Sequence, residues 1–247
     1  MTSPPSHRCG FTLMEVLVTM AIGSVLLFIA ATLLGGAGDT YNRGSGSVSA
    51  EREARALLTQ MSEDFAKAEW HPETIFTTEG EGWKKSRAGF LSLQPSDAQS
   101  EEGRIGDLCA LQYYVKDIKV GDATVRCLMR GFRESAVVFP ELRSGEFKSL
   151  FGEEVTDEPV AFGVLSFEIT PLEKDPTTGR LSTWSKDPNQ PVDMIRIRLV
   201  IARRELLGKL TTTRDWDSSE FRGDPKEAIH NRDLEVYEVI QRFGNDA

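Results

Sequence analysis

The sequence predicts an α+β protein in which a long N-terminal helix, transmembrane at first and amphipathic beyond, packs on an antiparallel β-sheet. Three patterns support this prediction. The run Val16–Leu34 has no charged residue, the segment after Ala50 has apolar residues at helical spacing, and the chain after Pro72 alternates in short runs. Of the 247 residues, 40% are hydrophobic and 27% charged, which is a globular composition with enough material for one sizeable core.

The uncharged run is long enough to cross a membrane. A helix over Val16–Leu34 covers about 29 Å at 1.5 Å per residue, close to the hydrocarbon thickness of a bilayer. Because Arg8 precedes the run, the positive-inside rule places the start of the chain in the cytoplasm and everything after Gly38 outside. A cleaved secretory signal is the alternative, since Gly36-Ala37-Gly38 offers small residues, but the apolar run exceeds the usual length of such signals.

The apolar run begins with Gly10-Phe11-Thr12-Leu13-Met14-Glu15. An unpaired carboxylate one turn into a membrane helix costs roughly 2.5–3.5 kcal/mol or more, so Glu15 needs a compensating charge. This motif resembles the type IV pilin and type II secretion pseudopilin families, whose leader ends in Gly and whose mature chain begins with Phe and has Glu at its fifth residue. A stray Glu near the interface, solvated by water, is the alternative.

The resemblance implies a processing pathway and a role for each motif residue. A membrane prepilin peptidase cleaves between Gly10 and Phe11 and N-methylates Phe11. The new ammonium of Phe11 then pairs with Glu15 of an incoming subunit in the fibre. The implied partners are prepilin peptidase, other pilin or pseudopilin subunits and the inner membrane, with the soluble domain in the periplasm and the assembled protein in a pilus or pseudopilus.

The resemblance at the N-terminus and the composition beyond it together divide the chain into four parts. Residues 1–10 form the prepilin leader, residues 11–36 the transmembrane helix, residues 37–49 a Gly- and Ser-rich junction, and residues 50–247 a soluble pilin-like domain. Each glycine costs about 1 kcal/mol relative to alanine inside a helix, so continuity of the helix through the junction is left open.

Within the soluble domain, helical spacing puts apolar residues on one face of a helix. This helix is predicted to end at the His71-Pro72 step, because a residue before proline disfavours the helical conformation. The later runs predict strands, of which Val160–Ile169 is apolar enough to be central, and Leu142–Phe151 predicts a short helix. The apolar helix positions are Ala54, Leu57, Leu58, Met61, Phe65 and Ala68; the predicted strands are Phe90–Leu93, Leu108–Val115, Val125–Met129, Val160–Ile169, Met194–Ala202 and Leu234–Ile240.

A narrower resemblance covers most of this domain. Its short motifs, in chain order, look like those of the J-type minor pseudopilin and the similar W-type minor pilin. This resemblance implies a place at the fibre tip in complex with other minor subunits. The motifs are the helix with Leu57, Met61, Asp64 and Phe65, the run Cys127-Leu128-Met129-Arg130, the run Val160-Ala161-Phe162-Gly163-Val164, the pair Thr183-Trp184 and the pair Pro191-Val192.

The cysteines raise the question of a disulfide. Processing would remove Cys9 and leave Cys109 and Cys127, both predicted to point inward from their strands. A hairpin that turns near Ile118 would place them opposite each other, and the periplasm would let a disulfide form. A turn at Val120–Asp122 would separate them and leave two buried thiols.

The remaining composition argues against catalysis and cofactors. The net charge is −9, from 29 Lys and Arg against 38 Asp and Glu, which disfavours nucleic acid as a partner. His7 falls in the leader, and His71 and His230 lie in predicted loops without a nucleophile-elbow motif, so we expect no enzyme, no catalytic residue and no cofactor. With no C-x-x-C pair, no structural metal site is predicted. The acidic residues Asp215, Asp217, Glu220 and Asp224 fit a solvated loop better than a calcium site of the kind some pseudopilins have.

The sequence therefore predicts a minor pilin- or pseudopilin-like structural subunit of a type II secretion or type IV pilus-like fibre. The alternative is an extracytoplasmic binding domain or enzyme, unrelated to pili, that uses the N-terminal segment as a membrane anchor or signal peptide.

Overall fold

The computed structural model describes residues 13, 14, 17, 20, 22–25, 27, 28, 52, 54–185, 187, 190–218, 220 and 223–244. The chain divides into two compact units, Met1–Val48 and Ser49–Ala247. In the first unit the described residues are helical. Among the described residues, no helix is long and apolar enough to cross a membrane. The predicted leader and the Gly- and Ser-rich junction lie outside the described residues.

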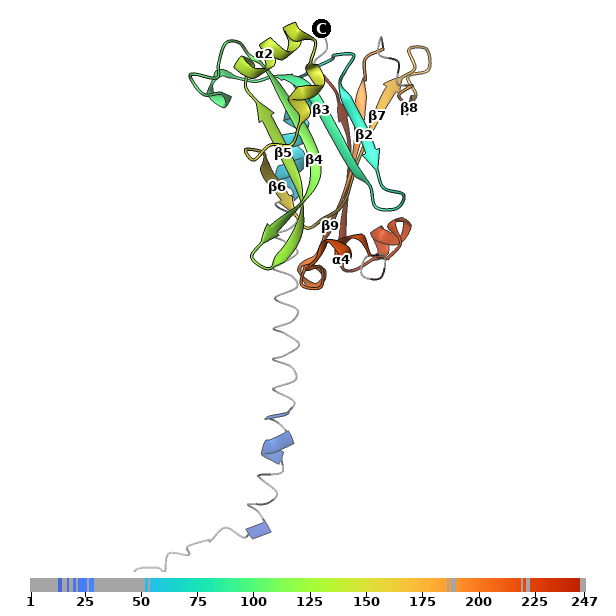
Figure 1. Cartoon of the computed structure of the whole chain (residues 1–247). Helices are drawn as coiled ribbons and strands as arrows, with labels where there is room; N and C mark the ends of the chain where they lie inside the picture. The colour runs from blue at the N-terminus through green and yellow to red at the C-terminus, as the bar shows by residue number, and fades with distance from the viewer. Residues whose placement is uncertain are drawn as a thin grey trace, which may run out of the picture. The chain divides into compact units, whose positions relative to one another are not determined.

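The second unit is built on a curled mixed β-sheet (Figure 1). Its described strands follow the order β10-β9-β7-β3-β4-β5-β6, with β1 and β2 added on β3 and β8 on β7. The strands are β1 (Ala68–Glu69), β2 (Ile75–Glu79), β3 (Lys85–Leu93), β4 (Leu108–Val120), β5 (Ala123–Arg133), β6 (Glu158–Phe162), β7 (Val164–Lys174), β8 (Leu181–Thr183), β9 (Met194–Ala202) and β10 (Leu234–Arg242).

Helical segments connect or cover these strands. Residues 54–66 form the N-terminal helix of this unit. The others are η1 (Ser96–Ala98), α2 (Ser135–Ser144), η2 (Phe147–Phe151), α3 (Arg204–Leu207), α4 (Thr213–Asp217) and η3 (Pro225–His230). Three long connections, for which the sequence predicts no helix or strand, contain short helices and strand β8; they are Gln94–Asp107, Glu173–Gln190 and Arg203–Asn231.

One strand pair departs from the predicted antiparallel sheet. β3 pairs with β7 in parallel, in register at Lys85 and Phe167. Further along, from Ala88 to Leu93, β3 pairs antiparallel with β4. β3 thus passes from β7 to β4 along its length, so the sheet divides at this strand and curls instead of lying flat. The α+β class is confirmed, and the purely antiparallel sheet is corrected to a mixed one.

The predicted central strand Val160–Ile169 is two strands. Gly163 has a φ of +75°, a left-handed conformation that breaks the strand. Before it, β6 pairs with β5 at the edge of the sheet, whereas after it β7 lies between β9 and β3. A Cβ at Gly163 would come within 2.8 Å of a Leu207 methyl group, so packing also favours glycine there. The apolar run was continuous because both strands are partly buried, and only β7 is central.

The N-terminal helix of this unit packs on the sheet through the predicted face. Ala54, Leu57, Met61 and Phe65 are buried, and the Phe65 ring stacks on Phe90 with 4.5 Å between ring centroids. The helical residues end at residue 66, and the chain enters β1 before reaching the predicted stop at His71-Pro72. Of the rest of the predicted long helix, residues 13, 14, 17, 20, 22–25, 27, 28 and 52 are helical, and the others lie outside the described residues.

Two further groups of buried side chains cover other parts of the sheet. One joins α2 and η2 to β3 and β4 and includes Val138, Phe147 and Phe151. The other includes Leu206 and Trp216, which pack against β7 and β9. The predicted helix over Leu142–Phe151 is the end of α2 and the whole of η2, separated at Gly145 with a φ of +77°. The buried clusters lie between Ala54 and Phe243, so residues 50–247 have a hydrophobic core of their own.

The two cysteines of the soluble unit do not meet. β4 and β5 turn at Gly121, and the register places Cys127 opposite Lys116. Cys127 packs with Tyr114 and Met129, whereas Cys109 shares the opposite face of β4 with Leu111 and Tyr113. Both cysteines are free and buried. The possible Cys109–Cys127 disulfide is therefore wrong, and the alternative of a turn at Val120–Asp122 with two buried thiols is confirmed.

We predict that both thiols are unreactive in the folded domain. Burial raises the pKa of Cys109 to about 11 and of Cys127 to about 12, so almost no thiolate, the reactive form, exists at pH 8. Residues 50–247, purified without reductant, should give no reaction with a thiol reagent when folded and two thiols per chain when unfolded. A mass two hydrogens lower than that of the reduced domain would contradict this.

Candidate functional site

The processing and assembly residues Gly10, Phe11 and Glu15 lie outside the described residues, so their roles stay predictions. The large apolar residues that the structure describes in the same segment are helical and exposed, with Leu13 at 80% and Met14 at 70%. Large apolar side chains exposed together on a helix are typical of a surface that meets lipid or another protein.

In the soluble unit, Asp64 connects the N-terminal helix to the sheet. Its side chain is 6% exposed and receives hydrogen bonds from Arg130 Nε at 2.8 Å and Arg130 Nη2 at 3.2 Å. Tyr113 Oη donates to Asp64 Oδ2 at 2.6 Å, and Gln94 Nε2 donates to Oδ1 at 3.4 Å. Burial and the Asp64 carboxylate raise the pKa of Tyr113 well above its usual value, so the phenol keeps the proton that it donates. A buried charge is thus compensated by three strand and loop residues.

Sequence reasoning missed this network, although it had named two of its members for the narrower resemblance. Asp64 occupies a position on the buried face of the helix, next to Phe65 and one turn after Met61. A carboxylate on an otherwise apolar face is a signal for a buried partner. The partner could not be identified, because Arg130 reaches Asp64 only through the observed strand order.

A second buried carboxylate fixes the loop before β6. Asp157 accepts hydrogen bonds from Arg133 Nη1 at 2.6 Å, Tyr114 Oη at 2.8 Å, Gln112 Nε2 at 3.1 Å and the Glu154 backbone N–H at 3.1 Å. Burial alone would raise the pKa of Asp157, but these hydrogen bonds, that from Arg133 above all, outweigh it and lower the pKa. The stability that the ionised form contributes is therefore present at neutral pH and is lost as the pH falls through the lowered value.

The acidic loop considered for calcium has other roles in the structure. Asp215 forms the capping box of α4 with Thr212, and Asp224 caps η3. Asp217 pairs with Arg126 at 2.8 Å. Within the part of the chain that the structure describes, no group of His, Cys, Asp and Glu side chains could hold a metal ion.

Of the two histidines beyond the leader, His71 stacks on Phe147 with 4.2 Å between ring centroids, and His230 ends η3. The stacking holds the imidazole of His71 against η2, whereas His230 is exposed.

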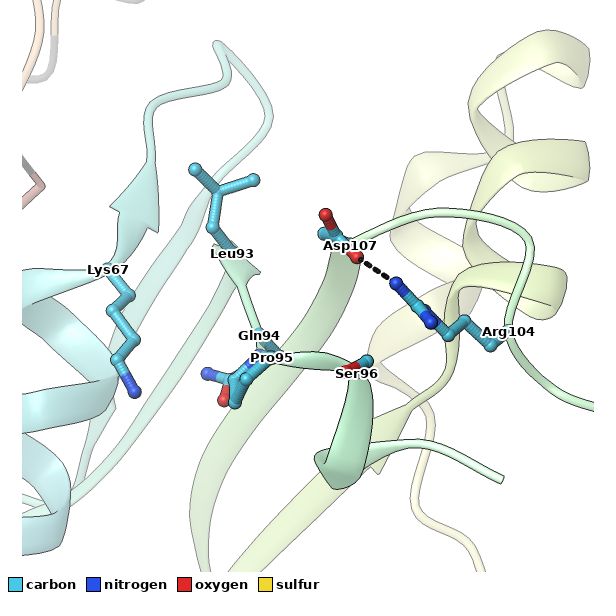
Figure 2. A pocket seen from close by; sticks show the side chains of 7 residues that line it. All are labelled: Lys67, Leu93, Gln94, Pro95, Ser96, Arg104 and Asp107. Atoms are coloured by element: carbon cyan, nitrogen blue, oxygen red, sulfur yellow. Dashed lines mark hydrogen bonds and ion pairs between the residues drawn. The ribbon is translucent and has the colours of Figure 1, made fainter. Parts of the chain in front are cut away.

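A pocket of about 480 Å³ opens beside the end of the N-terminal helix (Figure 2). Lys67 lies on one side of it and Arg104 on the other, with Gln94 and Pro95 between them. Arg104 Nη2 pairs with Asp107 at 3.3 Å. Leu93, Ser96 and Asp107 complete the lining. No sequence pattern predicted this pocket, since its loop belongs to the connection Gln94–Asp107, for which no helix or strand was predicted.

Comparison with known proteins concerns the N-terminal segment. A family model described as the prokaryotic N-terminal methylation motif matches residues 5–31, which include Gly10, Phe11 and Glu15. No curated protein matches the chain. The motif is of the type IV pilin-like kind, and it implies processing by prepilin peptidase, anchoring in a membrane and assembly with other pilin subunits. The predicted resemblance is confirmed at this level.

We predict that the Asp64–Arg130 pair is a major contributor to the stability of the soluble domain. Asp64→Ala leaves the partly buried Arg130 guanidinium, whose side chain is 19% exposed, without its carboxylate and should lower the free energy of unfolding of residues 50–247 by about 3–5 kcal/mol. The double variant Asp64→Leu/Arg130→Met removes both charges and should lose much less than the two single variants together. Urea unfolding measures each value.

The matched control is the exposed pair Arg196–Glu238, whose side chains are 44% and 53% exposed. Glu238→Ala should change the free energy of unfolding by less than about 1 kcal/mol. Equal losses for Asp64→Ala and Glu238→Ala would show that the Asp64–Arg130 pair contributes no more to the free energy of unfolding than an exposed pair does.

Proposed function

We propose that the protein is a minor pilin- or pseudopilin-like structural subunit of a type II secretion or type IV pilus-like fibre. The observation that supports this most is the methylation motif at residues 5–31, with Gly10, Phe11 and Glu15 at the spacing of prepilins. The apolar run Val16–Leu34 anchors the subunit in the bacterial inner membrane in a single pass, and the soluble domain faces the periplasm.

In this proposal, each of the three motif residues takes part in one step of processing or assembly. Gly10 has no side chain to obstruct an extended backbone at the peptidase site. Cleavage creates the ammonium of Phe11, and N-methylation retains its charge. In the low-dielectric membrane that ammonium attracts Glu15 of another subunit, where salt screens the pair weakly and an unpaired carboxylate is costly. The membrane segment thus drives polymerisation, and the soluble domain offers surfaces to neighbouring subunits or cargo.

The contacts of the soluble domain support the narrower J- or W-type proposal. Asp64 and Arg130, from two of the motifs that resemble those proteins, form an ion pair in which the aspartate is buried. Trp184 and Val192, from two other motifs, belong to the same buried cluster of apolar side chains. Short motifs that lie far apart in the sequence thus contribute to one core. We propose on this basis a place at the fibre tip with other minor subunits, and a structural role without catalysis, cofactor or nucleic acid.

The mass of the mature N-terminus tests the proposed function. Protein isolated from its own bacterial membrane should begin with N-methylated Phe11, because the peptidase cleaves after Gly10 on the cytoplasmic side. Gly10→Val should leave the uncleaved precursor in the membrane, since the valine side chain obstructs the extended backbone. A mature chain that begins with Met1 would instead indicate a simple membrane-anchored domain, and one that begins near Asp39 would indicate a secreted domain.

A second prediction separates anchoring from assembly. Glu15→Ala should insert, be cleaved and accumulate normally, because removing a carboxylate from a membrane helix makes insertion easier. The variant lacks the partner of a neighbour's Phe11 ammonium, so its recovery with other fibre subunits should fall at least tenfold. Recovery of Glu15→Ala at the wild-type level would show that the Glu15 carboxylate has no role in assembly.

A further inference from the structure

The pocket of Figure 2 has more positive than negative charge on a strongly acidic protein. Lys67 and Arg104 face it, against the single carboxylate of Asp107, whereas the whole chain has a net charge of −9. Lys67 has no ion-pair partner among the described side chains. The Arg104–Asp107 pair joins side chains that are 46% and 61% exposed, so it is weak and exchanges readily for another carboxylate.

The walls of the pocket are held in place by hydrogen bonds. The Leu93 N–H donates to the Lys67 carbonyl at 2.9 Å, and the Gln94 N–H donates to the Asp107 carbonyl at 2.8 Å. The Gln94 side chain is 6% exposed, and its Nε2 donates to Ser92 Oγ at 2.9 Å and to Asp64. The helix end and the loop are therefore fixed to β3 before anything binds, which lowers the entropic cost of binding.

Apolar side chains lie beside the two cations. Leu93 lines the pocket and is 41% exposed, and Pro95 lies between Lys67 and Arg104. Ile105, next to Arg104 in the chain, is 62% exposed. A small molecule here would keep much of its surface in water, whereas typical small-molecule pockets bury 70–90% of their ligand. A protein surface can cover the exposed apolar side chains and the pocket together.

We infer that this pocket binds an acidic segment of an adjacent fibre subunit, in which a carboxylate follows an apolar side chain. The carboxylate lies between Lys67 and Arg104, and the apolar side chain packs on Leu93 and Pro95. The inference rests on the proposed function for the identity of the partner as a fibre subunit. Charge complementarity selects an acidic partner, and it disfavours a basic one by repulsion.

The first experiment uses the full chain in its own bacterium. The double variant Lys67→Glu/Arg104→Glu reverses both pocket cations, and we expect its recovery in the sheared fibre fraction to fall at least tenfold. N-methylation of Phe11 should be unchanged, since processing takes place in the membrane segment. Residues 50–247 with the same substitutions should unfold near the wild-type temperature, because Arg104 is exposed and Lys67 is partly exposed.

The matched control is Arg143→Glu/Lys148→Glu, which makes the same change of net charge at exposed positions of α2 and η2. This control should enter fibres at the wild-type level. Wild-type recovery of the pocket variant, or equal losses for both variants, would overturn the inference.

The second experiment tests the pocket without any fibre. Residues 50–247, labelled with ¹⁵N, are titrated with the blocked peptide acetyl-Leu-Glu-Glu-amide and, as a control, with acetyl-Leu-Lys-Lys-amide. The acidic peptide should shift the amide signals of Leu93, Ser96 and Asp107, and the shifts should disappear in Lys67→Glu/Arg104→Glu. Equal shifts with the lysine peptide, or none with the acidic one, would overturn the inference. If the acidic peptide binds but the chain is not cleaved before Phe11, the proposed function is contradicted, and binding of an acidic ligand in the pocket is still supported.

Discussion

The ion pair between the buried Asp64 and the partly buried Arg130 is the contact on which the arrangement of the second unit depends. It joins a helix to a strand far along the chain, and Tyr113 and Gln94 donate to the same carboxylate. Apolar packing alone would let the helix slide along the sheet, because hydrophobic attraction is not directional. The Asp64 carboxylate can accept hydrogen bonds from a guanidinium, a phenol and an amide at once only in one position of the helix. The network therefore determines where the helix lies on the sheet.

The consequences of that fixed position extend to the sheet. With the helix held against β3 and β4, the ring of Phe65 stacks on Phe90, and the Leu93 N–H reaches the Lys67 carbonyl. β3 pairs with β7 near its start and with β4 further along, so the two parts of the sheet diverge from the strand that the helix covers. The pocket at the end of the helix is a product of the same geometry, because Gln94 donates a hydrogen bond to Asp64 and lines the pocket as well.

Local sequence patterns predicted the helices and strands well, but they did not predict how the strands pair or in which register. The alternation in Met194–Ala202 matches β9 at both ends, and the helix face from Ala54 to Phe65 is buried as predicted. The break at Gly163 was missed because an apolar run does not reveal a positive φ, and the disulfide failed because the turn at Gly121 sets the register. The candidate site divides in the same way: the motif is contiguous and was recognised, whereas the network and the pocket exist only once the strands are paired.

The distribution of charge connects stability with recognition. Strand β5 has three arginines, Arg126, Arg130 and Arg133, and each is directed to a buried or partly buried aspartate. These cations neutralise carboxylates inside the domain, so their charges are already compensated and do not attract a partner. Lys67 and Arg104 are at the surface, where any positive field stands out against a net charge of −9. An acidic subunit that used all its cations internally would repel acidic neighbours. A pocket with fixed walls and two cations offers such neighbours a defined place to dock.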